Sequence, residues 1–75
     1  MYQFTLNQVQ VLLADKSQLA DIKKDPTIMT TRYKNQKELK QFMTAWMVYE
    51  GEKTVCVYHH NVEKLRYYFI QNYKP

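Results

Sequence analysis

The chain of 75 residues has one glycine, two prolines and one cysteine. With so few residues that favour tight turns, the sequence favours helices joined by short connections over many short strands. Because Cys56 has no partner within the chain, a disulfide framework is excluded and nothing requires an oxidising compartment. The sequence therefore predicts a mainly helical protein in the cytoplasm.

Long apolar runs are also absent, and no stretch approaches the roughly 20 residues needed to cross a bilayer. The N-terminal segment MYQFTLNQ has neither the basic flank nor the apolar block of a secretion signal. There is no glycine-rich phosphate loop and no nucleophile elbow. These absences predict a soluble, non-enzymatic protein without a membrane partner.

The chain is rich in the residues that build a core, since 45% of it is apolar and 15% is aromatic. This composition excludes the low hydrophobicity of a disordered chain. No repeat, linker or low-complexity tract interrupts it, so residues 1–75 are expected to form a single domain. A domain this small is stabilised by dense apolar packing or by association.

The net charge of +4 is concentrated in one short stretch. Residues 32–40 carry Arg32, Lys34, Lys37 and Lys40 against Glu38 alone. A local excess of positive charge beside a tyrosine indicates an anionic partner, either nucleic acid or an acidic protein surface.

Two helical stretches are expected in the N-terminal third, as two helices or as one, because no glycine or proline separates them. Thr5 to Gln8 has the form of a capping box, and apolar residues follow it at helical spacing. A second stretch, residues 17–24, has Ser17 as its candidate N-cap. Asp25-Pro26 interrupts the helical pattern, and residues 27–33 are expected to form an irregular segment or a short strand.

The clearest predicted element is an amphipathic helix over residues 35–47. Its apolar side comprises Leu39, Phe42, Met43 and Trp46, and its polar side comprises Lys37, Lys40, Gln41 and Thr44. The helix is expected to end between residues 47 and 50, with Gly51 as terminator. In a competing interpretation, residues 44–49 and 53–58 are the arms of a β-hairpin.

Both interpretations share a strand at 53–58, and a last helix is expected over residues 61–73. The predicted fold class is α+β, a small single domain that is mostly helical, with a short antiparallel element of two or three strands near residues 45–58. The expected core comprises Leu6, Val9, Leu13, Leu19, Ile22, Leu39, Phe42, Met43, Trp46, Val55, Val57, Leu65 and Phe69.

The leading functional hypothesis is a nucleic-acid-binding accessory or regulatory protein. Lysines at helical spacing form a row that suits phosphates, and tyrosines beside them can stack on bases. The candidate contacts are Arg32, Tyr33, Lys34, Lys37, Lys40 and Gln41. An ordinary solvated helix face accounts equally well for the lysines, and core packing accounts for the tyrosines.

The alternative hypothesis is a protein-binding inhibitor or adaptor of phage or mobile-element type. The last predicted helix is apolar on almost every side, which indicates either a contact surface or a position inside the core. The candidate contacts are Arg66, Tyr67, Tyr68, Ile70 and Tyr73. Pairing of this helix with the same helix of a second copy would give a homodimer, and burial within one chain explains its apolar character equally well.

Cys56, His59, His60 and Glu63 form the only cluster with metal or catalytic chemistry. A structural zinc site usually has four ligands, and no second cysteine is available. Cys56 also lies in a Val-Cys-Val run typical of a buried strand, where a thiol is a weak nucleophile. We therefore expect no metal, no cofactor and no catalytic residue, and assign the histidines to capping or to a pH-sensitive role.

Overall fold

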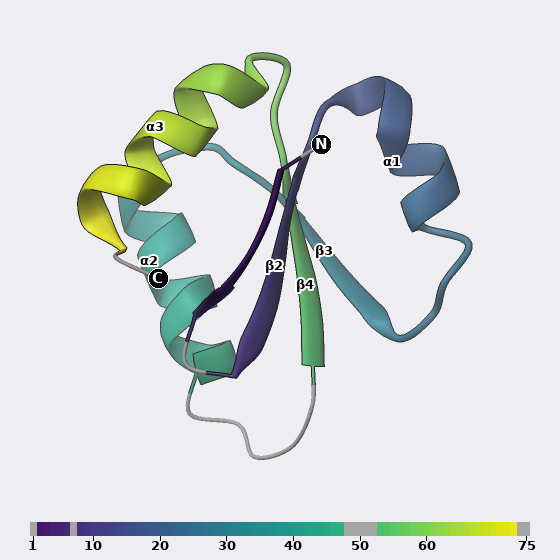
Figure 1. Ribbon diagram of the computed structural model, residues 1–75, viewed down its shortest axis with the longest axis horizontal. Helices are drawn as coiled ribbons and strands as arrows, with labels where there is room; N and C mark the ends of the chain where they lie inside the picture. The colour runs from purple at the N-terminus through teal and green to yellow at the C-terminus, as the bar shows by residue number, and fades with distance from the viewer. Residues whose placement is uncertain (1, 7, 48–52, 74–75) are drawn as a thin grey trace.

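The computed structural model describes residues 2–6, 8–47 and 53–73. In chain order, the elements are β1 (Tyr2–Leu6), β2 (Val9–Ala14), α1 (Lys16–Ile22), β3 (Ile28–Arg32), α2 (Gln36–Met47), β4 (Lys53–Tyr58) and α3 (Val62–Asn72). The strands form one mixed sheet in the order β1-β2-β4-β3, in which β1 is antiparallel to β2 and the other three are parallel. Helix α1 lies on one side of the sheet, and α2 and α3 lie on the other (Figure 1).

The prediction of a mostly helical domain with a short antiparallel element near residues 45–58 is therefore wrong. Residues 44–47 belong to α2, so they are not a hairpin arm. The strand predicted at 53–58 is present, but it is the central strand β4, paired in parallel with both β2 and β3. The helix end was predicted between residues 47 and 50, and residues 48–50 and the predicted terminator Gly51 lie outside the described residues.

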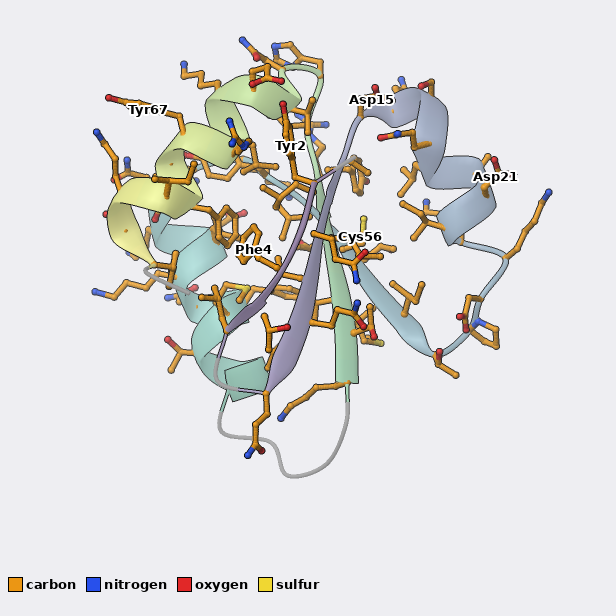
Figure 2. The ribbon with its side chains drawn as sticks, in the orientation of Figure 1. Tyr2, Phe4, Asp15, Asp21, Cys56 and Tyr67 are labelled. Carbon is orange, nitrogen blue, oxygen red and sulfur yellow. The ribbon has the colours of Figure 1, made fainter. Side chains whose placement is uncertain are left out.

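The predicted N-terminal helix is also wrong, because this segment is a β-hairpin. Leu6 pairs with Val9, so two residues join β1 to β2, and Gln8 has a φ of 69°. A two-residue hairpin turn commonly requires positive φ, which non-glycine residues adopt at a cost. In β1, Tyr2 and Phe4 point toward α3, as Figure 2 shows.

The predicted second helix is confirmed as α1, with a different first residue. Asp15 rather than Ser17 is the N-cap: its carboxylate accepts from the amides of Ser17 and Gln18, and the Gln18 side chain accepts from the Asp15 amide. This is a complete capping box. The segment after Pro26 forms β3, which confirms the strand alternative for residues 27–33.

The helices predicted at 35–47 and 61–73 are confirmed as α2 and α3. The side-chain oxygen of Asn35 accepts from the amide of Glu38 at 2.9 Å, and that of Asn61 accepts from the amide of Lys64 at 3.1 Å. These bonds satisfy amides of the first turn, which have no partner within a helix.

Two apolar clusters hold the layers together. The α2/α3 face of the sheet carries the larger one, which comprises Leu6, Val9, Val11, Leu13, Leu39, Met43, Val55, Val57, Leu65 and Phe69. The α1 face carries the smaller one, which comprises Leu12, Ala14, Ile22 and Cys56, with Ile28 packed against it. Figure 2 shows Cys56 pointing toward the α1 side.

The expected core agrees closely with these clusters. Leu19, expected in the core, is also buried, whereas Phe42 is only partly buried. The side chain of Trp46 lies outside the described residues. The prediction omitted Val11, Leu12, Ala14 and Cys56, which lie on strands that are covered on both sides.

None of the three helices in the described ranges has both the length and the apolar character needed to span a bilayer.

Candidate functional site

The carboxyl ends of the three parallel strands meet at one edge of the sheet. There β2 leads into α1 on one face, whereas the neighbouring strand β4 leads into α3 on the other (Figure 1). In α/β sheets, ligands bind where adjacent strands diverge in this way. A cavity of about 740 Å³ opens at this edge, which we call the basic cavity. Its lining comprises Lys16, Leu19, Lys23, Arg32, Tyr33, Lys34, Tyr58, His59 and His60.

Two elements supply the four cations of the basic cavity. Lys16 and Leu19 of α1 and its C-cap residue Lys23 follow the i, i+3, i+7 spacing that places side chains on one helix face. Arg32 ends β3 and Lys34 follows it by two residues, and alternate residues of an extended chain share a side. Two separate segments of the chain therefore bring two cations each to the same cavity.

The cavity is positively charged because its described lining includes four lysine or arginine residues and no acidic residue. One of the four cations has a partial counter-charge, since Lys34 Nζ lies 4.0 Å from Glu38 Oε2. The nearby carboxylate of Asp15 is occupied in capping α1. Hydrogen bonds, first from the Ser17 side chain and then from the amides of Ser17 and Gln18, lower the pKa of Asp15.

A second, smaller cavity of about 200 Å³ adjoins the first, and we call it the tyrosine cleft. Its lining comprises Tyr33, Gln36, His59, Lys64, Leu65, Tyr67, Tyr68, Gln71 and Asn72. The ring of Tyr33 lies 5.5 Å from that of His59, edge-on, and 5.8 Å from that of Tyr68. Tyr67 points outward from α3 (Figure 2). Tyr33 and His59 line both cavities, so they form the wall between them.

Hydrogen bonds fix the position of this wall. The Tyr33 amide donates to the carbonyl of Tyr58 at 3.0 Å, which ties the end of β3 to β4. The Asn61 amide donates to His59 Nδ1 at 3.0 Å. His59 Nδ1 also lies 3.3 Å from the carbonyl oxygen of Asn61. The two contacts hold the His59 ring against the N-cap residue of α3.

The structure brings together half of the residues predicted for nucleic-acid binding. Arg32, Tyr33 and Lys34 line the basic cavity. Lys37, Lys40 and Gln41 are exposed on α2 and line neither cavity, so they form a separate surface.

The residues predicted for protein binding are divided between two sides of α3. Tyr67 and Tyr68 line the tyrosine cleft. Arg66, Ile70 and Tyr73 line a third cavity of about 260 Å³ beside β1, which we call the β1 groove. In this groove the Arg66 guanidinium carbon lies 4.6 Å from the centre of the Tyr2 ring.

One contact attaches β1 to α3 beside the β1 groove. The hydroxyl of Tyr2 donates to Glu63, and this hydrogen bond is the main reason that the pKa of Tyr2 is raised. Strand β1 is thereby attached to the first turn of α3.

Sequence reasoning missed Lys16, Lys23 and Tyr58 and gave His59 and His60 other roles. The spacing of Lys16, Leu19 and Lys23 was visible, but its meaning depends on the parallel sheet that turns α1 toward the ends of β3 and β4. The rings of His59 and His60 lie 4.1 Å apart. Cys56 is buried in β4, and the described residues contain no group of three side chains positioned to hold a metal.

Comparison with protein-family models, with curated proteins and with solved structures found no match to this chain.

Proposed function

We propose that this protein is a non-enzymatic nucleic-acid-binding protein whose phosphate contacts are made in the basic cavity. The observation that carries this proposal is the convergence of Lys16, Lys23, Arg32 and Lys34 on one cavity with no acidic residue in its described lining. Lysine and arginine that neutralise phosphates release counterions, which drives association. The proposed binding is therefore strong at low salt and weak at high salt.

The geometry also supports binding over catalysis. The buried Cys56 is a poor nucleophile, because burial raises the pKa of its thiol to about 11. Lysines act on phosphates as point charges, and Arg32 is the one side chain in the cavity suited to bidentate contacts. Such a set holds a phosphate backbone without reading its sequence.

The test compares two charge reversals that change the net charge equally. Lys16→Glu with Lys23→Glu removes one wall of the basic cavity, and Lys37→Glu with Lys40→Glu alters the exposed face of α2. Affinity for mixed-sequence DNA and RNA is measured by fluorescence anisotropy at about 50 and about 200 mM salt. Circular dichroism confirms that each variant is folded.

We expect the first pair to weaken binding at least about tenfold at low salt. It should also reduce the slope of the logarithm of the binding constant against the logarithm of the salt concentration by about 1 to 2. The second pair acts only at long range, so it should weaken binding by less than about threefold. Equal losses would place the contacts on α2 as much as in the cavity. If the wild type retains neither DNA nor RNA at low salt, nucleic acid is not the partner.

A protein-binding role is the second candidate, because the β1 groove lies along an edge strand of the sheet. Among the strands of the described residues, β1 pairs with β2 alone, and Ile70 in the groove is 52% exposed. Extended peptides add to such edges while a neighbouring pocket receives their side chains. The edge suits either an acidic protein segment, which Arg66 would attract, or a second copy of the chain.

This second candidate is tested with Ile70→Glu, which places a charge in the groove at an exposed position. Nuclease-treated extract is passed over immobilised wild type and variant, and sedimentation is measured over a range of concentrations. A protein-binding role predicts a defined partner, or self-association, that Ile70→Glu abolishes while circular dichroism is unchanged. Identical behaviour of the two proteins would eliminate it.

A further inference from the structure

Residues 32–34 place two cations in the basic cavity and an aromatic ring in the wall that this cavity shares with the tyrosine cleft. Alternate residues of an extended chain point in opposite directions. Lys34 and Arg32 accordingly line the basic cavity only, while the ring of Tyr33 packs against His59 and Tyr68. A positively charged cavity and an aromatic cleft are thus immediate neighbours.

The tyrosine cleft combines flat rings with amide side chains. Its aromatic members are Tyr33, His59, Tyr67 and Tyr68, and its amide members are Gln36, Gln71 and Asn72. Asn72 Nδ2 donates to the carbonyl of Tyr68 at 2.9 Å, which leaves its oxygen as an acceptor. Rings stack on the faces of nucleobases, and amides bond to their edges.

We infer that the nucleic acid is single-stranded, with its phosphates in the basic cavity and an unpaired base in the tyrosine cleft. This inference rests on the proposed function and names the form of nucleic acid that the site receives. Phosphate binding alone needs only the cations, which leaves the adjoining aromatic cleft without a role. In a duplex the faces of the bases are covered by their neighbours, so the rings of Tyr33 and Tyr68 cannot reach them.

The two cavities also differ in charge. Of the described residues that line the tyrosine cleft, only Lys64 is a lysine or arginine, whereas the basic cavity has four. The cleft is therefore suited to the uncharged part of a nucleotide and the basic cavity to its phosphate. His59 lines both cavities and therefore lies between them.

The test uses three probes with equal numbers of phosphates per strand: a labelled oligothymidylate, an abasic strand of the same length, and a duplex that contains the labelled strand. Wild-type affinity for each is measured by anisotropy at low salt. Stacking is worth about tenfold or more for one base, so the oligothymidylate should bind at least about tenfold more tightly than the abasic strand. The duplex should bind no more tightly than the abasic strand.

Two variants locate the effect in the cleft. Tyr33→Leu keeps an apolar side chain against the core but removes the ring, and Tyr67→Ser changes a side chain that is 63% exposed. Tyr67 lines only the cleft, so Tyr67→Ser should weaken binding of the oligothymidylate several-fold and leave the abasic strand unaffected. Tyr33 also lines the basic cavity, so Tyr33→Leu should weaken binding of the oligothymidylate several-fold more than binding of the abasic strand. The matched control is Met29→Ser, an exposed apolar residue of β3 outside both cavities, which should change neither affinity.

The outcomes distinguish this inference from the proposed function. If all three probes bind equally well and with the same salt dependence, the protein binds phosphate backbones and the base-binding cleft is refuted. The inference also fails if the duplex binds most tightly. If no probe binds at low salt, the proposed function fails and the inference fails with it. The wild-type comparison of base-containing and abasic strands decides the matter even if Tyr33→Leu does not fold.

Discussion

The two faces of the sheet differ in how they are covered. On the α2/α3 face, two helices of 12 and 11 residues bury a continuous apolar cluster that includes Val11, Val55 and Phe69. On the α1 face, one helix of seven residues covers a cluster less than half that size, which includes Leu12 and Cys56. Lys16 of that short helix and its C-cap residue Lys23 line the basic cavity.

This difference separates stability from binding. Burial of apolar area is the main favourable term in folding, so the face with the larger cluster provides most of the stability. Surfaces that bind charged ligands need exposed cations, which add little to stability. The α1 face can carry such cations because the other face holds the fold together.

The largest expected effect is the loss of stability when the α2/α3 cluster is truncated. Phe69 is 1% exposed and packs against the rings of Phe4 and Tyr73. Phe69→Ala should cost about 3 to 5 kcal/mol. The whole stability of a domain this size is about 4 to 11 kcal/mol. Urea unfolding followed by circular dichroism should therefore show that the variant loses a large part of its free energy of unfolding.

The matched change on the α1 face is Ile22→Ala, at a residue that is 9% exposed. It should cost about 2 kcal/mol, the lower end for such truncations, and leave the variant folded. If Ile22→Ala lowers the free energy of unfolding as much as Phe69→Ala does, the α1 face is as important for stability as the α2/α3 face.

The same difference explains which elements the sequence could predict. Helix α2 has one clear apolar side, α3 has apolar residues at helical spacing, and both begin at an asparagine cap, so their positions were predictable. Strand β2 is covered on both faces and reads as a nearly continuous apolar run, VQVLLA, which also fits helical spacing. The choice of helix was wrong because β2 is stabilised by pairing with β1 and β4. The turn that joins β1 to β2 contains no glycine to mark it, and β4 is distant from β2 in the sequence.

The candidate site was half predictable for a related reason. Arg32 and Lys34 stood out as part of a charged stretch, whereas Lys16 and Lys23 lie in a segment where aspartates balance the lysines. Only the parallel arrangement of β2, β4 and β3 brings these segments to one edge. Net charge along the chain does not report which charges share a cavity in space.

An effect of intermediate size is expected on local opening of the α1 face, which can occur without unfolding of the whole protein. Cys56 is fully buried beneath the α1 cluster, so alkylation of its thiol requires local opening. Ile22→Ala should raise the open population roughly thirtyfold for a cost of about 2 kcal/mol, and the alkylation rate should rise equally. The rate is followed by mass spectrometry in native buffer. Rapid labelling of the wild type would mean that this face is not closed.

A smaller effect is expected at alkaline pH, where the two faces also differ in chemistry. Burial raises the pKa of Cys56 from its ordinary value of 9.0 to about 11. The folded state then keeps a proton that the unfolded state releases, so this contribution is complete below pH 9 and is lost as the pH rises toward 11. Urea unfolding should show declining stability over this range, and Cys56→Ala should decline less steeply. If the stability of the wild type and that of Cys56→Ala decline equally steeply with pH, the decline is due to the tyrosines and not to Cys56.

The smallest effect concerns the attachment of α1 itself. Hydrogen bonds from Ser17 and Gln18 lower the pKa of Asp15, so the stabilisation by its carboxylate is complete above the ordinary pKa of 3.8 and is lost as the pH falls through the lowered value. Asp15→Ala should lower the thermal midpoint slightly at neutral pH, because the amides at the start of α1 lose their acceptor. Asp15→Asn is the control, since asparagine caps a helix without titrating.

The Asp15 pair also bears on binding, because α1 carries half of the cations of the basic cavity. With α1 frayed, Lys16 and Lys23 no longer hold fixed positions opposite Arg32, so Asp15→Ala should weaken nucleic-acid binding a few-fold and Asp15→Asn should not. Both substitutions remove the same negative charge, so the bulk electrostatic gain is equal in the two variants and cancels in the comparison. Equal affinities would mean that the order of α1 does not matter to the site, and that the lysines act only through their charge.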